Sequence, residues 1–142
     1  MGGDLPPVVR VVEAVLETME RFAPVAPAHN PPYVAAMRMF RQVLGDTPLV
    51  AAFEPGFHQT NPPHRRLYAV DPRWAGDFGV KRYGFHGASH RYVAWRIGRD
   101  MPTARRVISC HLGGSSSLCA IRDGRSVATS MGLSPQSGVP QG

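Results

Sequence analysis

The first 61 residues contain two helical patterns and one apolar run. Valine, leucine and methionine recur every three or four positions over residues 8–21, with charged residues between them, which predicts an amphipathic helix. Prolines then interrupt the pattern, and a second helix is expected from about Pro32 to Leu44. The continuous apolar run at 48–54 predicts a short buried strand. The polar, proline-rich stretch 55–66 predicts a loop.

Turn signals and a third helix follow. Asp71 and the proline after it favour a short helical turn. Gly84 and Gly87 flank Phe85 and His86, which places His86 on an exposed loop. A helix then begins, with its N-cap expected at Ser89.

The last 37 residues change to a strand pattern. Strands are expected at 107–111, 117–121 and 125–130. A turn of two glycines and two serines, 113–116, joins the first two, and Asp123-Gly124 predicts a tight hairpin between the second and third. The pattern therefore predicts an antiparallel meander.

Length and composition limit the class of protein. The chain has 142 residues, of which 43% are hydrophobic, and this length is typical of one domain. No apolar run approaches the roughly 20 residues of a membrane-spanning helix. The N-terminus fits neither a secretory signal nor a transit peptide. With only Cys110 and Cys119, no disulfide framework or four-ligand zinc cluster is expected, so a cytoplasmic protein is predicted.

The net charge of +6 is unevenly distributed. Residues 1–61 hold four arginines against six acids, whereas residues 62–142 hold 12 basic residues against four acids. The second half is therefore expected to prefer an anion: nucleic acid, a phosphorylated small molecule or an acidic partner surface. Fifteen of the 16 basic residues are arginine, which suits phosphate contacts, although a genome-wide preference for arginine would give the same count.

Two places suggest ligand chemistry. In HLGGSSSL (111–118), backbone N–H groups and hydroxyls can converge on an anion such as phosphate, although the same composition describes an ordinary turn. It is not a Walker loop, because no lysine or helix follows the glycines. His111 either donates to such an anion or is a hydrogen-bonded residue at a strand end. Glu54 lies at the end of the expected strand 48–54, where α/β proteins often bind ligands.

Other chemistries have weaker support. His86 and His90 are spaced for one helix face, but zinc needs a third ligand and no H-E-x-x-H is present. No G-x-S-x-G accompanies a serine nucleophile. Cys110 and His111 point to opposite faces of a strand, which excludes a local cysteine–histidine pair. Aromatic residues are not interleaved with the arginines as they are in many single-strand nucleic-acid binders.

Three stretches together resemble consecutive motifs of the acetate kinase family: FEPGFHQTNP (53–62), KRYGFHGASHRYV (81–93) and VISCHLGGSSSLCAIRDGRSVATSMGLSP (107–135). APAHNPP (26–32) resembles a further one. The resemblance implies an α/β fold, part of the ribonuclease H-like bilobed fold shared by acetate and sugar kinases, actin and heat-shock ATPases, truncated at both ends. Residues 1–105 are then expected to form the last part of the first lobe and the crossover. Residues 106–142 are expected to be the first three antiparallel strands of the second lobe.

The resemblance also implies site residues. Glu54 matches the active-site aspartate, with a side chain one methylene longer, and would position a metal ion or the substrate. His86 matches the histidine that stabilises the transition state. The substrate pocket would include Phe85, Pro135 and Ala28, and because Ala28 replaces a larger aliphatic residue the pocket is expected to be roomier. The nucleotide-phosphate turn is matched by five residues: His111, Leu112, Gly113, Gly114 and Ser115.

The function implied is ATP-dependent phosphorylation of a short-chain, acetate-like carboxylate to an acyl phosphate, with Mg²⁺. A homodimer is implied as well, with no nucleic-acid or membrane partner. Family strands and a second catalytic arginine would lie outside these 142 residues, so the isolated chain is expected to be inactive. The alternative is an inactive truncated remnant or a partner-binding module.

Overall fold

The computed structural model describes residues 1–140, which fall into two compact units: residues 1–56, and the described residues from Phe57 onward. The expected lobe boundary between residues 105 and 106 concerns a complete bilobed fold and stays a prediction. Among the described residues, no helix has both the length and the apolar content needed to cross a membrane.

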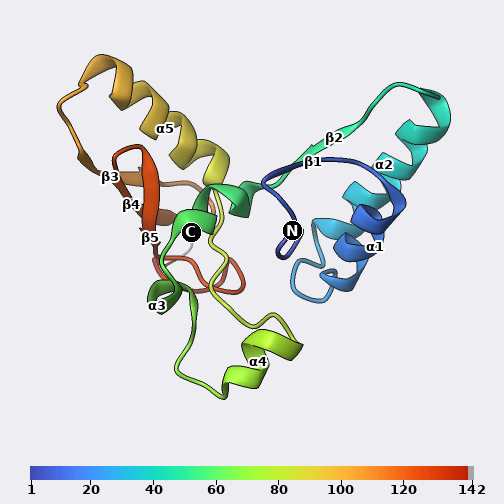
Figure 1. Cartoon of the computed structure of the whole chain (residues 1–142), viewed down its shortest axis with the longest axis horizontal. Helices are drawn as coiled ribbons and strands as arrows, with labels where there is room; N and C mark the ends of the chain where they lie inside the picture. The colour runs from blue at the N-terminus through green and yellow to red at the C-terminus, as the bar shows by residue number, and fades with distance from the viewer. Residues whose placement is uncertain (141–142) are drawn as a thin grey trace. The chain divides into compact units, whose positions relative to one another are not determined.

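The first unit contains a two-stranded antiparallel sheet and two helices (Figure 1). Its elements are β1 (Val8–Arg10), α1 (Glu13–Arg21), α2 (Asn30–Val43) and β2 (Val50–Ala52). The second predicted helix is confirmed within two residues at each end. The first predicted helix, residues 8–21, is wrong at its start, because Val8–Arg10 is a strand that pairs with Val50–Ala52. The predicted strand 48–54 is shorter than expected and only its central residue is buried.

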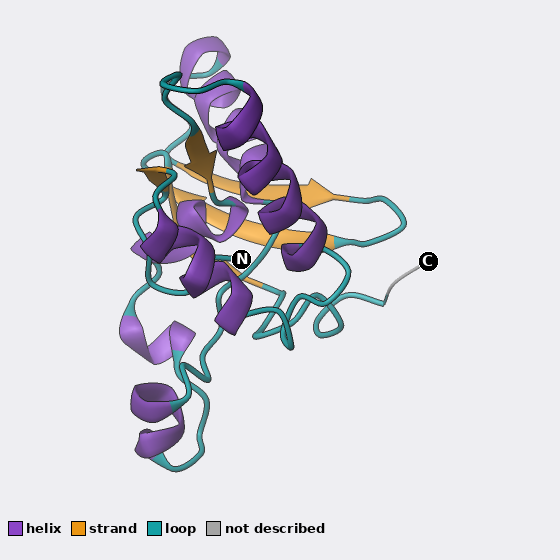
Figure 2. Ribbon diagram, turned by 90° about the vertical axis from the view of Figure 1, so that its right-hand side faces the viewer, coloured by secondary structure: helices purple, strands orange, loops and turns teal. Residues whose placement is uncertain are grey.

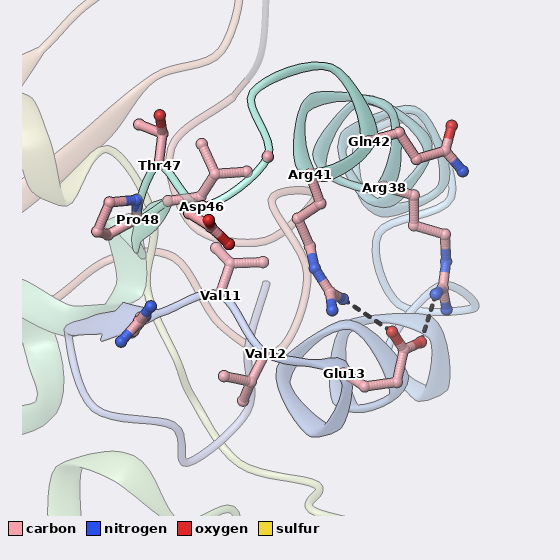
Figure 3. A pocket seen from close by; sticks show the side chains of 12 residues that line it. Val11, Val12, Glu13, Arg38, Arg41, Gln42, Asp46, Thr47 and Pro48 are labelled. Carbon is pink, nitrogen blue, oxygen red and sulfur yellow. Dashed lines mark hydrogen bonds and ion pairs between the residues drawn. The ribbon is translucent and has the colours of Figure 1, made fainter.

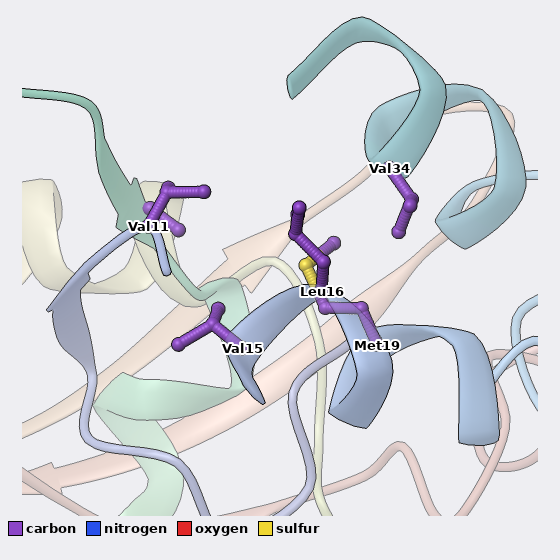
Figure 4. Close-up of a cluster of buried hydrophobic side chains, with 6 residues drawn as sticks. Val11, Val15, Leu16, Met19 and Val34 are labelled. Atoms are coloured by element: carbon purple, nitrogen blue, oxygen red, sulfur yellow. The ribbon is translucent and has the colours of Figure 1, made fainter. Parts of the chain in front are cut away.

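Apolar side chains of α1 form the core of the first unit (Figure 4). Leu16 and Met19 are fully buried among Val11, Val15, Val34 and Ala51. At the start of α2, the amide of Asn30 donates to the carbonyl oxygens of Met1 (2.9 Å) and Met19 (2.7 Å), and its oxygen accepts from the N-terminal ammonium group. These bonds satisfy a buried amide that would otherwise destabilise the unit.

The second unit contains short helices, one long helix and three strands. Its elements are α3 (Pro63–Arg66), α4 (Pro72–Asp77), α5 (Gly87–Asp100), β3 (Arg106–His111), β4 (Ser117–Arg122) and β5 (Arg125–Thr129). The 3-10 helix η1 (Glu54–Thr60) leads into it from the first unit. The predicted loop 55–66 is therefore wrong over much of its length, because η1 and α3 occupy it. The helical turn at Asp71 is confirmed: its carboxylate accepts from the backbone N–H of Arg73 at 2.9 Å.

The three strands form the predicted antiparallel meander, in the order β3-β4-β5. Helix α5 packs against β3 (Figure 2). The hairpin between β4 and β5 has positive φ at both Asp123 (51°) and Gly124 (76°), as a type I′ turn requires. Alternate residues of β4 are buried, namely Ser117, Cys119 and Ile121. The strand therefore presents a serine, a cysteine and an apolar residue to the interior.

Candidate functional site

Four imidazole rings gather in the second unit. His58 lies on η1, His86 and His90 on α5 and its cap, and His111 at the end of β3. The rings of His86 and His111 are stacked, with centroids 4.0 Å apart and planes at 19°. The ring centroid of His90 lies 5.7 Å from that of His58 and 6.4 Å from that of His111. Sequence reasoning singled out His86 and His111, and the structure brings these two together.

The backbone before α5 directs His86 toward this cluster. Gly84 has φ +76°, and a Cβ there would lie 2.6 Å from Cδ2 of His58 and 2.7 Å from Cγ2 of Thr129, so the position requires glycine. His86 also has a left-handed conformation (φ 55°) and is the N-cap of α5. The helix starts at Gly87, so the predicted N-cap at Ser89 is wrong. Because the helix starts earlier, His86 and His90 lie one turn apart and face the same serine.

That serine is Ser117, at the start of β4. Its Oγ lies 2.9 Å from Nδ1 of His86 and 2.8 Å from Nε2 of His90. On the other side of the His90 ring, Nδ1 lies 2.9 Å from Oγ of Ser109 in β3. Ser109, Ser117 and His90 are all buried. Both nitrogens of His90 are thus hydrogen-bonded to strand serines, which joins α5 to the sheet through polar contacts.

His58 anchors the other side of the cluster. Its Nε2 donates to the carbonyl oxygen of Phe85 at 2.9 Å, and its Nδ1 lies 2.9 Å from Oγ of Ser126. Ser126 also contacts Asn61 (2.8 Å) and the thiol of Cys119 (3.3 Å). Since Phe85 immediately precedes His86 in the chain, His58 holds the peptide from which His86 projects.

Burial determines the charge of the central ring. Desolvation by burial, together with smaller repulsion from the neighbouring rings of His58, His86 and His111, lowers the pKa of His90 from 6.5 to about 4. His90 is therefore neutral at pH 7. Burial likewise raises the pKa of the Cys119 thiol, which keeps it protonated.

The glycine–serine turn between β3 and β4 begins at His111. Leu112, Gly113 and Gly114 are exposed, and Ser115 is half-buried. Within the turn, the hydroxyl of Ser116 donates to the carbonyl oxygen of Gly113 at 3.1 Å. A Cβ at Gly114 would point into open space, so the chain's own packing does not require glycine there. The neighbouring Gly113 lies beside the imidazole pair, since a Cβ there would be 3.7 Å from Nε2 of His111.

The remaining predicted residues are distributed over both units. Glu54 is an exposed carboxylate at the first position of η1, and Ala28 is exposed just before α2; both belong to the first unit. Phe85 and Pro135 are half-buried in the second unit. Across residues 1–140, no three histidine, cysteine or acidic side chains are grouped as a metal site would need.

An open pocket of about 620 Å³ in the first unit contains none of the predicted site residues (Figure 3). Figure 3 shows Glu13 between Arg38 and Arg41. Glu13 forms ion pairs with both, at 2.9 Å to Arg41, and Arg38 also pairs with Glu20 at 3.1 Å. Because these pairs are largely exposed, they add little stability. Because Glu13, Arg38 and Arg41 already pair with one another, this pocket has a weaker chemical case than the imidazole cluster.

Sequence reasoning missed much of the network around His86. It did not identify the supporting side chains His58, Ser109, Ser117 and Ser126, and it considered His90 only as a zinc ligand. One signal was present: serines occupy inward positions of the expected strands, and a buried hydroxyl needs a hydrogen-bond partner. A histidine one helical turn after His86 was the natural partner to look for.

The fold is that of an α/β protein in which a long helix packs on an antiparallel meander, preceded by a smaller helical unit. The chain belongs to the Acetokinase family, whose model matches residues 5–142. It is 48% identical over 136 residues to a propionate kinase of Citrobacter rodentium, covering 94% of this chain and 34% of that protein. It is 42% identical over 138 residues to an acetate kinase of Geobacillus kaustophilus, and the match covers 94% of this chain and 35% of that protein.

Solved structures agree with this family. The crystal structure of a propionate kinase from Francisella tularensis matches with a TM-score of 0.88 and 34% identity, over 95% of this chain and 36% of that one. That of an acetate kinase from Entamoeba histolytica matches with a TM-score of 0.87 and 32% identity, over 98% and 37%. The fold class expected from the motifs is therefore confirmed. The chain spans about a third of the length of the relatives it matches.

Proposed function

We propose that this chain forms part of the active site of a kinase that phosphorylates a short-chain carboxylate, such as acetate or propionate. The observation that carries the proposal is the stacked pair of His86 and His111 at the start of an exposed glycine–serine turn. Imidazole and backbone N–H donors side by side suit an anion that gains charge during reaction. The names of the relatives, propionate kinase and acetate kinase, support the carboxylate as acceptor.

In the proposed reaction, a carboxylate oxygen of the substrate attacks the terminal phosphorus of ATP. The bond from that phosphorus to the bridging oxygen breaks, and the products are ADP and an acyl phosphate. Phosphoryl transfer depends mainly on positioning and on donors around the transferring group. His86 would donate a hydrogen bond to an oxygen of that group, and residues 111–115 would bind the nucleotide phosphates.

Glu54 fits a role toward Mg²⁺. The ion keeps several waters and phosphate oxygens and is often held through only one or two protein carboxylates. Glu54 offers one exposed carboxylate, and no larger acidic group is needed for such a site. When bound, Mg²⁺ would neutralise charge on the phosphates.

The choice between acetate and a longer carboxylate would depend on an apolar pocket. Phe85 and Pro135 are the half-buried candidates for its walls, and the small side chain of Ala28 favours a substrate larger than acetate. Each extra methylene accommodated in an apolar pocket is worth roughly 1–3 kcal/mol. We therefore propose propionate over acetate as the better substrate.

A hybrid enzyme tests the proposed function. Residues 5–142 would replace the matching third of the Francisella propionate kinase, and acyl phosphate would be trapped with hydroxylamine as the hydroxamate. We expect ATP-dependent hydroxamate formation with propionate. A folded hybrid that binds nucleotide but forms no hydroxamate with any short carboxylate would contradict the proposal. The isolated 142-residue chain is expected to give none above buffer.

Exposed apolar side chains favour a second candidate role, in which the chain serves as a partner-binding module. Val8 and Val50, opposite ends of the β1–β2 pairing, are 52% and 62% exposed, and a short sheet with apolar residues on its surface invites a further strand. Size-exclusion chromatography with light scattering would reveal assembly. A monodisperse monomer would count against this role. The predicted homodimer and cytoplasmic location stay predictions.

A further inference from the structure

The hydroxyl of Ser117 links the protonation of two histidines. Its Oγ lies within hydrogen-bond distance of Nδ1 of His86 (2.9 Å) and of Nε2 of His90 (2.8 Å), yet a hydroxyl carries a single proton. Ser117 can donate to only one of the rings. With the other ring it must act as acceptor, so that ring must donate an N–H hydrogen bond to Oγ. The nitrogen of His90 that carries the proton therefore determines which nitrogen of His86 is protonated.

Ser109 decides which nitrogen of His90 is protonated. Within the described part of the chain, Oγ of Ser109 forms its side-chain hydrogen bond with Nδ1 of His90 at 2.9 Å, and Ser109 is 3% exposed. If Nδ1 of a neutral His90 donated, the buried hydroxyl proton of Ser109 would lack that acceptor. A buried donor left unsatisfied is unfavourable. The hydroxyl of Ser109 therefore donates to Nδ1, and the proton of His90 resides on Nε2.

The order of donors follows from this. Ser109 donates to Nδ1 of His90, Nε2–H of His90 donates to Ser117, and Ser117 donates to Nδ1 of His86. A neutral His86 then carries its proton on Nε2. The groups facing His90 are His58, His86 and His111, and a positive charge on any of these rings would oppose protonation of His90, which lies fully buried among them.

We propose that His90, acting through Ser117, is a positioning residue that holds His86 as its Nε2–H tautomer. The inference rests on the proposed function, in which Nε2–H of His86 donates to the transferring phosphoryl group. The proposal adds a specific cause for that donor: the hydroxyl of Ser117 donates to Nδ1 of His86, and this hydrogen bond favours the tautomer in which Nδ1 carries no proton.

The test is a tautomer measurement on the 142-residue chain, with ¹⁵N-labelled histidine and long-range ¹H–¹⁵N NMR correlations at pH 7. We expect His86 to show a protonated Nε2 and an unprotonated Nδ1. The variant His90→Gln keeps an N–H donor toward Ser117 and should preserve this state. In His90→Leu and Ser117→Ala, the fraction of His86 that is protonated on Nδ1 should rise. The exposed His29 is the internal reference and should be unchanged throughout.

Three results would overturn the inference. In the unaltered chain, His86 protonated on Nδ1, or exchanging like free imidazole, contradicts the donor order. An unchanged His86 tautomer in Ser117→Ala contradicts the link through the hydroxyl. Ser109→Ala provides a second check if His90→Leu fails to fold, because it removes only the donor to Nδ1 and should weaken the preference. None of these readouts needs catalysis, so an inactive hybrid kinase would count against the proposed function alone.

Discussion

Gly84 provides a sharp test of the packing around the imidazole cluster. In Gly84→Ala, the new Cβ would meet Cδ2 of His58 at 2.6 Å and Cγ2 of Thr129 at 2.7 Å. The chain also contains a matched control, Gly124, which has the same φ of +76° but open space around its Cβ position. Gly124→Ala therefore introduces the same backbone strain without the steric clash.

The expected magnitudes follow from these two terms. Placing alanine in a left-handed conformation costs about 1–2 kcal/mol, and this cost applies at both positions. Overpacking against His58 and Thr129 adds about 1–3 kcal/mol at Gly84 alone, because an imidazole hydrogen-bonded at both nitrogens cannot move aside easily. We therefore expect losses of about 2–5 kcal/mol for Gly84→Ala and about 1–2 kcal/mol for Gly124→Ala.

Urea unfolding followed by tryptophan fluorescence measures the difference. Trp74 and Trp95, the two tryptophans of the chain, both lie in the second unit, so the signal reports on that unit. The histidine NMR spectrum of Gly84→Ala should also show a displaced His58 ring. Equal losses of stability in the two variants would refute the packing around Gly84 described here.

Three further predictions concern burial and charge. Because the pKa of His90 is lowered to about 4, mainly by desolvation, its neutral ring stabilises the second unit above pH 6.5 by up to about 3 kcal/mol. That contribution should be lost as the pH falls from 6.5 toward 4, and urea midpoints should show a flatter pH dependence in His90→Gln. Cys110 is exposed and Cys119 buried with a raised pKa, so Ellman's reagent should label Cys110 quickly and Cys119 only on unfolding; fast labelling of both would contradict the core. Leu16→Ala should destabilise the first unit by about 2–5 kcal/mol in urea unfolding followed by circular dichroism, whereas the exposed Val43→Ala should have little effect.

Much of the fold was predictable because its signals are local. Helix α2 and the three-strand meander follow from periodicity and turn residues within short windows. The start of the chain was not predictable in this way. Val8–Arg10 continues the helical spacing of α1, yet it pairs with Val50–Ala52, some 40 residues away in the sequence. A long-range pairing overrode the local pattern there.

The same difference between local and long-range signals explains which site residues could be predicted. His86 and the turn after His111 stand out within contiguous motifs, so sequence reasoning found them. The residues that hydrogen-bond to the cluster do not stand out in the sequence. His58 and Ser126 are 68 positions apart, and His86 and Ser117 are 31 positions apart. Such pairs depend on strand register, and register is set by the whole sheet. The roles of Glu54 and Ala28 remain predictions.

The most direct test of the central claim is the turnover number of His86→Ala in the hybrid kinase, measured by hydroxamate formation. His64→Ala is the control, because His64 is an exposed histidine on α3, outside the cluster. Losing one donor to the charge that develops in a transition state typically lowers the rate about 100-fold to 1,000-fold. We predict a loss of that size for His86→Ala and an unchanged rate for His64→Ala. Equal rates in the two variants would contradict the assignment of His86 to phosphoryl transfer.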